Sequence, residues 1–149
     1  MDSKQPQFPQ PISPVEKKEK IKLHILIADD GETNRSLYKD MLEHLGHTVE
    51  VVNDGDALLD RLFSDGEEVD LVFSDNTMPG RTGLEVLQEI RSNSRLKKLP
   101  FILNTTDEEG YIEKDVELMD GVFVPKVSSM KAMSDAIKKA KEVAEKIEV

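Results

Sequence analysis

The stretch "DLVFSDNTMPGRTG", residues 70–83, joins a short apolar segment to an acidic residue. The apolar triplet 71–73 leads directly into a Ser-Asp pair, and a Pro-Gly pair soon follows, which ends any strand. A carboxylate at the end of a buried strand is costly unless it has a partner or a chemical task. The first question is therefore whether other strands end in groups that can act together with Asp75.

Outward from this stretch, apolar strands alternate with amphipathic helices along the chain. Strands are predicted at 21–28, 47–52, 69–74, 99–105 and 121–124. One helix is predicted to end near Gly46 and another to begin after Thr82. Further helices are predicted over 55–63, 107–119 and 129–148, and Ser128 or Ser129 is the expected cap of the last one. This alternation indicates βα units, and so an α/β fold in which a five-stranded parallel sheet is doubly wound, with helices on both faces.

The apolar spacing also predicts which side chains face the sheet. In the first helix Leu37, Met41 and Leu45 lie four residues apart, with Tyr38 and Leu42 beside them. The second helix is expected to bury Leu58, Leu59, Leu62 and Phe63 together, and Thr82 and Glu85 match the capping box that begins a helix.

Composition and charge limit the classes of protein to consider. With 149 residues, 38% of them hydrophobic, the chain is long enough for one domain, predicted over 21–149 with an extended last helix. Residues 1–20 hold four of the seven prolines and are predicted to be a flexible Pro-rich leader. A formal net charge of -10 argues against binding to nucleic acid.

The chain also lacks the marks of a secreted or membrane protein. It has no cysteine, which excludes a disulfide framework, and no apolar run long enough for a membrane span. A soluble protein in the cytoplasm, with no membrane partner, is therefore expected.

Reactive groups stand at the ends of four predicted strands. These are Asp29 and Asp30, Asp75, Thr105, and Lys126. Each alone has a plain explanation, since an aspartate after a strand is often a helix cap and a lone lysine is usually a solvated surface residue. Because the carboxyl ends of parallel strands meet at one edge of the sheet, the set is expected to form a single site.

The chemistry of such a set favours a divalent cation. Three clustered carboxylates repel one another unless a cation compensates, and Mg²⁺ takes oxygen ligands while leaving room for a phosphoryl oxygen. Asp75 could then act as a nucleophile that forms an aspartyl phosphate. The Thr105 hydroxyl and the Lys126 ammonium would stabilise the other phosphoryl oxygens.

At this point the sequence resembles the receiver domain of the response regulators of two-component signalling. The resemblance rests on "ILIADD", "DLVFSDNTMPGRTGLEVL", "PFILNTT" and "FVPK", and covers about 22–142. It implies a flavodoxin-like fold, similar to that of the chemotaxis regulator, with strand order 2-1-3-4-5. It also implies a signalling phosphoacceptor that assists its own phosphorylation and dephosphorylation, and not an enzyme.

The resemblance also implies roles for individual residues. Asp75 would be the phosphoacceptor, Asp30 a direct Mg²⁺ ligand, Asp29 a ligand acting mostly through water, and the Thr77 backbone carbonyl a further ligand, with Mn²⁺ as an alternative ion. The switch residues would be the Thr105 hydroxyl and the aromatic ring of Phe123, and Lys126 would be the family's lysine.

Two positions depart from the family pattern near the phosphorylation site. The family usually has Lys-Pro after the fifth strand, with a cis bond, whereas this chain has Pro125 before Lys126. Thr106 replaces the usual small alanine, which adds a hydroxyl beside the site. The direction from which Lys126 approaches the site is therefore not implied by the resemblance.

Partners follow from the same resemblance. Phosphate would come from a sensor histidine kinase or a phosphotransfer protein, and the output face would be formed by 107–119, 121–124 and 129–148. Over 107–120 the only base is Lys114, so a downstream protein with a basic surface is one hypothesis and a homodimer through this face is another. The acids of this segment are Asp107, Glu108, Glu109, Glu113, Asp115, Glu117 and Asp120.

Other functions stay open from the sequence. A phosphorylation-independent scaffold is the main alternative, and a receiver cut from a longer protein is another. An aspartyl-phosphate phosphatase would need an Asp-x-Asp motif after the first strand, where "ADDGET" has adjacent acids. A flavin or nucleotide binder would need a glycine-rich loop there, which is absent.

Overall fold

Five parallel strands form the centre of the molecule. The structure is a computed structural model that describes residues 21–107, 110–126 and 129–148. The strands are β1 (His24–Ala28), β2 (Thr48–Val52), β3 (Leu71–Ser74), β4 (Phe101–Asn104) and β5 (Val122–Val124). Their order in the sheet is β2-β1-β3-β4-β5, which confirms the doubly wound fold and the predicted strand order. The proposed leader, 1–20, and Ser128 lie outside the described residues.

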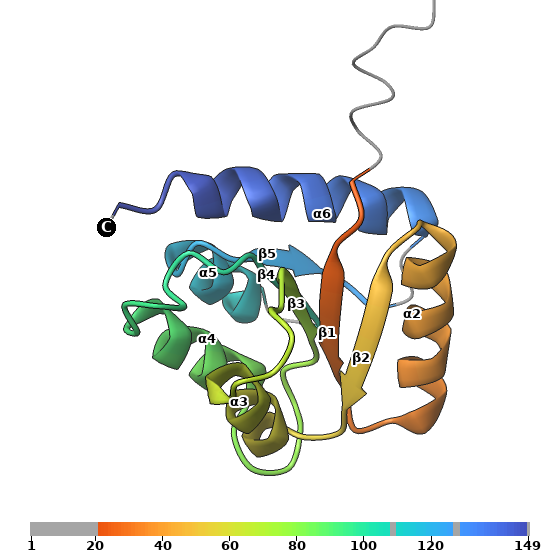
Figure 1. The fold of residues 1–149 in the computed structure, drawn as a ribbon, viewed down its shortest axis with the longest axis horizontal. Coiled ribbons are helices and arrows are strands. Elements are labelled where there is room, and N and C mark those ends of the chain that lie inside the picture. The colour runs from red at the N-terminus through yellow and green to blue at the C-terminus, as the bar shows by residue number, and fades with distance from the viewer. Residues whose placement is uncertain (1–20, 108–109, 127–128, 149) are drawn as a thin grey trace, which may run out of the picture.

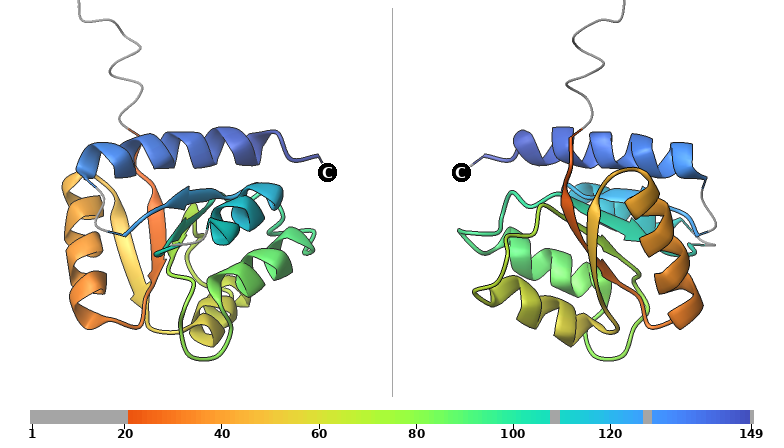
Figure 2. Two further views of the ribbon diagram at one scale, coloured as in Figure 1. Left: turned by 180° about the vertical axis from the view of Figure 1, so that it is seen from behind. Right: turned by 45° about the vertical axis from the view of Figure 1, so that its right-hand side comes forward.

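Helices cover both faces of this sheet. They are α2 (Glu32–His44), α3 (Gly55–Phe63), α4 (Gly83–Arg91), α5 (Tyr111–Leu118) and α6 (Met130–Glu145). α2 and α6 pack on one face, and α3, α4 and α5 pack on the other (Figures 1 and 2). None of these helices, within the described part of the chain, is long and apolar enough to cross a membrane.

The pleat of β1 divides its apolar side chains between two cores. Ile25 and Ile27 pack with α2 and α6, whereas Leu26 and Ala28 pack with α3 and α4. All four are completely buried, which explains why this strand is a continuous apolar run. By the same alternation, Asp29 continues the row of Ile25 and Ile27, on the side of α2 and α6.

Two predicted inward-facing residues are exposed, so these predictions were wrong. In α2 the core is made by Tyr38 and Leu42, and the Tyr38 ring centroid lies 5.3 Å from that of Phe73. Leu37, about 100° further round the helix, is 49% exposed. Phe63 is the last residue of α3 and is 43% exposed, whereas Leu58, Leu59 and Leu62 fill the core side of that helix.

The last two helices are shorter than predicted. α5 begins at Tyr111 and not at 107, because Gly110 adopts a positive φ of 81° that ends any helical turn before it. The Asp107 carboxylate accepts hydrogen bonds from the Gly110 and Glu113 amides and so caps the start of α5. α6 spans 16 residues, or about 24 Å, and ends at Glu145. Ser129 is its N-cap.

Candidate functional site

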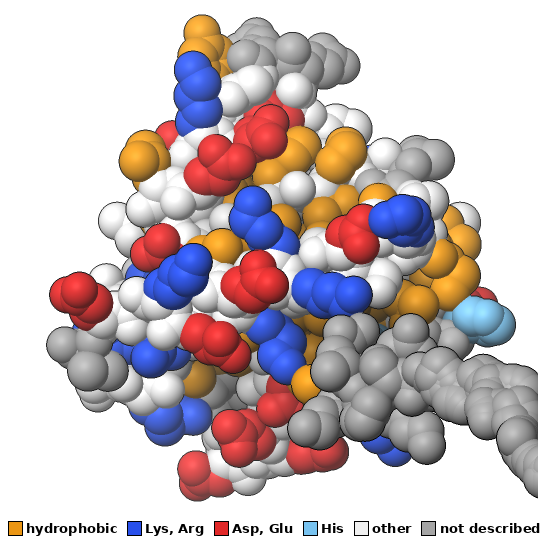
Figure 3. Space-filling view, turned by 90° about the horizontal axis from the view of Figure 1, so that it is seen from above, with side chains coloured by type: hydrophobic (Ala, Val, Ile, Leu, Met, Phe, Trp, Pro, Cys, Tyr) orange, Lys and Arg blue, Asp and Glu red, His pale blue; other side chains and the backbone are white. Residues whose placement is uncertain are grey.

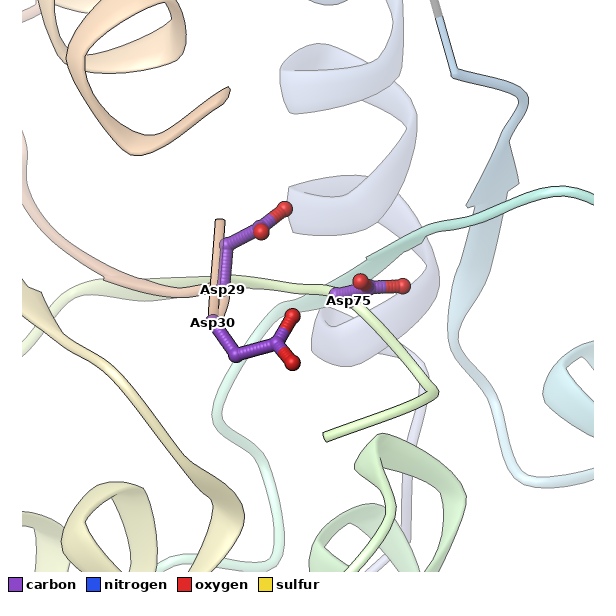
Figure 4. Close-up of side chains that lie close together, drawn as sticks. All are labelled: Asp29, Asp30 and Asp75. Atoms are coloured by element: carbon purple, nitrogen blue, oxygen red, sulfur yellow. The ribbon is translucent and has the colours of Figure 1, made fainter. Parts of the chain in front are cut away.

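Three carboxylates meet at the carboxyl ends of β1 and β3. Asp29, Asp30 and Asp75 each offer an oxygen, and these oxygens lie within 4.8 Å of one another. The parallel register explains this meeting, because Ala28 pairs with Ser74 and the two strands end together. Figure 4 shows the three side chains close together, with the carboxylates of Asp29 and Asp30 extending toward the side on which Asp75 lies.

Two of the three carboxylates are buried and held by backbone amides. Asp29 is 3% exposed and its Oδ1 accepts from the Gly31 amide at 2.8 Å. Asp75 is 7% exposed and its Oδ1 accepts from the Asn76 amide at 2.7 Å. Asp30 is exposed to solvent. One oxygen of each buried carboxylate is thus fixed, and the other is turned to the shared space.

Lys126 supplies the positive charge of the site. Its ammonium Nζ lies 2.7 Å from Asp29 Oδ2 and 3.3 Å from Asp75 Oδ2, and donates to both. Burial lowers the pKa of Lys126, but the two carboxylates outweigh this, so the pKa lies above its ordinary value and the lysine is charged at neutral pH. The Pro125-Lys126 order therefore does not keep the lysine out of the site.

The carboxylate cluster fits a small divalent cation. Two oxygens bound to one Mg²⁺ lie at most about 4.2 Å apart, since each metal–oxygen distance is about 2.1 Å. The observed spacing within 4.8 Å needs only a small closure of the cluster. Asp29, Asp30 and Asp75 are the groups that could hold the ion, and Lys126 leaves their net charge negative.

The other predicted site residues lie just after β4, on β5 and in the loop after β3. Thr105 follows β4 and is 3% exposed, whereas Thr106 beside it is exposed. Phe123 is half-buried in β5 and pairs with Leu103, which places it on the same face of the sheet as Thr105. The Thr77 side chain is exposed on the loop after Asp75, and the role of its carbonyl stays a prediction.

The loop that follows Asp75 is tied back to α4. The Gly83 amide donates to the Asn76 carbonyl at 3.0 Å, and Asn76 Oδ1 accepts from the Leu84 amide at 3.0 Å. Thr82 and Glu85 form the predicted capping box, with distances of 3.1 and 2.8 Å. The first turn of α4 is therefore anchored to the residue next to Asp75.

Sequence reasoning missed three residues that shape the site. Arg35 donates to the Asp29 carbonyl at 2.7 Å, and Asn76 braces the loop after Asp75. Asn104 is a completely buried amide at the end of β4. The only signal in the sequence is the polar side chain of Asn104 after three apolar residues, and an ordinary residue at the end of a strand gives the same signal.

A doubly wound parallel sheet with an acidic site at its carboxyl edge is the architecture of a signalling receiver domain. The family model described as the response regulator receiver domain matches residues 25–138. This is most of the chain, so the protein belongs to the response regulator receiver domain family, a component of two-component systems.

Known relatives agree with this assignment. The chain is 37% identical over 86 residues to the chemotaxis protein CheY of Pseudomonas aeruginosa, an alignment that covers 57% of this chain and 68% of that protein. It is 28% identical over 138 residues to the two-component response regulator ARR5 of Arabidopsis thaliana, covering 82% of this chain and 74% of that one. It is also similar to the structure of the response regulator TrrA of Thermotoga maritima in complex with Mg²⁺ and BeF, with a TM-score of 0.68, 30% identity, and coverage of 79% of this chain and 98% of that one.

Proposed function

We propose that this receiver domain accepts a phosphoryl group on Asp75 in a reaction that depends on Mg²⁺. The observation that carries the proposal is the meeting of three carboxylates within 4.8 Å with the Lys126 ammonium donating to two of them. Binding of Mg²⁺ in the TrrA structure supports the choice of ion, with Mn²⁺ as the alternative. Asp30, Asp29, Asp75 and the Thr77 carbonyl would hold it.

The chemistry follows from the positions of the side chains. Asp75 Oδ2 faces the shared space, while its Oδ1 is held by the Asn76 amide, so Oδ2 is the attacking atom. It forms a bond to phosphorus as the bond from phosphorus to the donor imidazole nitrogen breaks, and that nitrogen leaves with the electron pair. A Mg²⁺ ion held by Asp29, Asp30 and Asp75 would neutralise charge on the transferring group. Lys126 and the Thr105 hydroxyl stabilise the phosphoryl oxygens.

Phosphorylation would be relayed through Thr105 to Phe123. These residues lie on one face of the sheet, the face covered by α5, so movement of Thr105 toward the phosphoryl group frees space for the half-buried Phe123 ring. The change is a shift between two existing conformations. It would alter the surface made by α5, β5 and α6.

This output surface has a mixed character. On α5, Tyr111 is 66% and Leu118 82% exposed, and they lie one heptad apart on the same side of the helix among exposed acids. On the face that α6 covers, acidic and basic side chains are interspersed (Figure 3). The acidic and apolar character of α5 favours a protein partner with a basic surface, and a homodimer through this face is the alternative.

The upstream partner would carry a phosphohistidine. Its class is a sensor histidine kinase or a phosphotransfer protein, since the chain supplies an aspartate acceptor and two of its own histidines have structural contacts. The His24 ring contacts Thr48 and Glu50, and His47 Nδ1 accepts from the Leu23 amide. We place this exchange in the cytoplasm, and a phosphorylation-independent scaffold is the alternative function.

The test is phosphate incorporation measured by intact mass. The full chain is incubated with MgCl₂ and acetyl phosphate, and we expect a mass gain of one phosphoryl group that disappears with a chelator. Asp75→Asn should abolish the gain. Asp60→Asn, at an exposed aspartate of α3, is the matched control and should be labelled normally. No labelling of the wild-type chain under conditions that label another receiver would refute the proposal and favour the scaffold.

A further inference from the structure

Asn104 lies next to the acidic site but has no part in the chemistry described above. Ser74 pairs with Leu103 and Asn104 pairs with Val124, so Asn104 stands between the end of β3, where Asp75 follows, and β5. It continues the row of Ile102, which packs with α2 and α6, as Asp75 continues the row of Phe73. The side chain is 1% exposed.

The carboxamide of Asn104 is turned toward the backbone that leads into Lys126. Its Nδ2 donates to the Val124 carbonyl at 3.2 Å and to the Pro125 carbonyl at 3.2 Å. Since both partners are acceptors, the two hydrogens of Nδ2 must face them, and this sets the orientation of the amide. The Pro125 carbonyl belongs to the peptide plane that ends at the Lys126 nitrogen, so holding this oxygen orients the lysine backbone.

The acceptor side of the same carboxamide is left unused. Asn104 Oδ1 is buried without a hydrogen-bond partner among the described residues. An unsatisfied buried acceptor is costly, and an apolar side chain at this position would avoid the cost. The feature that requires asparagine at position 104 is therefore its Nδ2 donor group. Pro125 has no N–H of its own, so its carbonyl is the backbone group through which this residue can be held by a hydrogen bond.

We propose that Asn104 is a positioning residue that fixes the Val124–Pro125 segment and thereby aims Lys126 at Asp29 and Asp75. This anchoring explains why, despite the Pro-Lys order, the Lys126 ammonium lies 2.7 Å from the Asp29 carboxylate and 3.3 Å from the Asp75 carboxylate. The importance of this aim for phosphoryl transfer rests on the proposed function. The effect of this aim on the Mg²⁺ affinity of the carboxylates does not rest on the proposed function, because Lys126 competes with any cation for them.

A double-mutant cycle in Mg²⁺ affinity tests the proposal without phosphorylation. The affinity of the full chain for MgCl₂ is measured by NMR titration for the wild type, Asn104→Val, Lys126→Ala and the double variant. Removing the ammonium should tighten Mg²⁺ binding about two- to fivefold. Asn104→Val should also tighten Mg²⁺ binding, because Lys126 is no longer held on the carboxylates. In the Lys126→Ala background, Asn104→Val should not change the Mg²⁺ affinity further.

Controls separate positioning from loss of folding. Ile102→Val changes a buried residue two positions earlier in β4, on the same face, and should leave Mg²⁺ affinity unchanged. Asn104→Ala is the second variant if Asn104→Val melts below the assay temperature. In the acetyl phosphate assay, Asn104→Val should slow labelling about ten- to a hundredfold, with little further effect when Lys126 is already alanine.

The outcomes are distinguishable. Unchanged Mg²⁺ affinity in the Asn104 variants, or an equal change with and without Lys126, would overturn the positioning role. If the wild-type chain takes up no phosphate, the proposed function fails, and the Mg²⁺ cycle still decides whether Asn104 acts through Lys126.

Discussion

Gly83 is the place where α4 touches the backbone of the phosphoacceptor residue. A Cβ at this position would lie 2.4 Å from the Asp75 carbonyl oxygen, 2.5 Å from Leu103 Cδ1 and 3.2 Å from Ser74 Oγ. Ordinary contacts begin at 3.4 Å, so in Gly83→Ala the helix or the strand end must move by about 1 Å. The Asp75 oxygen is backbone and cannot turn aside.

Both the stability and the chemistry should respond to this movement. Overpacking costs about 1–3 kcal/mol, and alanine in a helix recovers about 0.5–1 kcal/mol, so we expect a net loss of about 1–2 kcal/mol in the free energy of unfolding. Because Asp75 is displaced, phosphate labelling should slow about a hundredfold. Urea unfolding followed by circular dichroism measures the first effect, and time-resolved intact mass measures the second.

Gly46→Ala is the matched control for Gly83→Ala. Gly46 has a φ of +104°, and no other part of the described chain comes within 4 Å of the place that a Cβ would take, so alanine there brings backbone strain of about 1–2 kcal/mol without a clash. It follows α2, at the end of the sheet away from Asp75. We expect a similar loss of stability with normal labelling. The reasoning is refuted if Gly83→Ala is labelled at the wild-type rate, or if both variants slow labelling equally.

Three further predictions concern the framework of the fold. Arg91 is held by four backbone carbonyls at 2.8–3.0 Å, and burial lowers its pKa to about 10, so Arg91→Met should lower the free energy of unfolding by about 2–3 kcal/mol in urea. Burial, and then Lys141, lower the pKa of His47 below its ordinary 6.5. The unfolded chain then binds more protons, so stability should fall as the pH drops below about 6.5, and less so in His47→Gln. Thr82→Ala should cost about 1 kcal/mol through loss of the cap.

Each of these has a control within the chain. Among the described residues the Arg95 guanidinium makes one hydrogen bond, to the Leu62 carbonyl, so Arg95→Met should cost less than half as much as Arg91→Met. An unchanged pH dependence in His47→Gln would show that another group titrates in that range. Ser92→Ala, at the opposite end of α4, should be nearly neutral beside Thr82→Ala, and equal losses would argue against the capping account.

Local sequence patterns predicted the fold well where burial is uniform. The continuous apolar runs of β1, β3 and β4 predicted strands, and the alternation with helices predicted the parallel sheet, because each strand carries its own signal. Face assignments were less reliable. Leu37 and Phe63 fit the apolar spacing but are exposed, since which side of a helix meets the sheet depends on the neighbours it packs against.

The sequence by itself determined which chemical groups stand at the strand ends. Asp29, Asp30, Asp75, Thr105 and Lys126 each follow a strand, and parallel strands place their carboxyl ends on one edge. Only the tertiary structure decided how these groups are aimed. The reach of Lys126 to two carboxylates depends on Asn104, which is distant in sequence from both β5 and the acids and bears no recognisable motif. Such contacts form between strands whose register is fixed by the packing of the whole sheet, and so no local pattern in the chain records them.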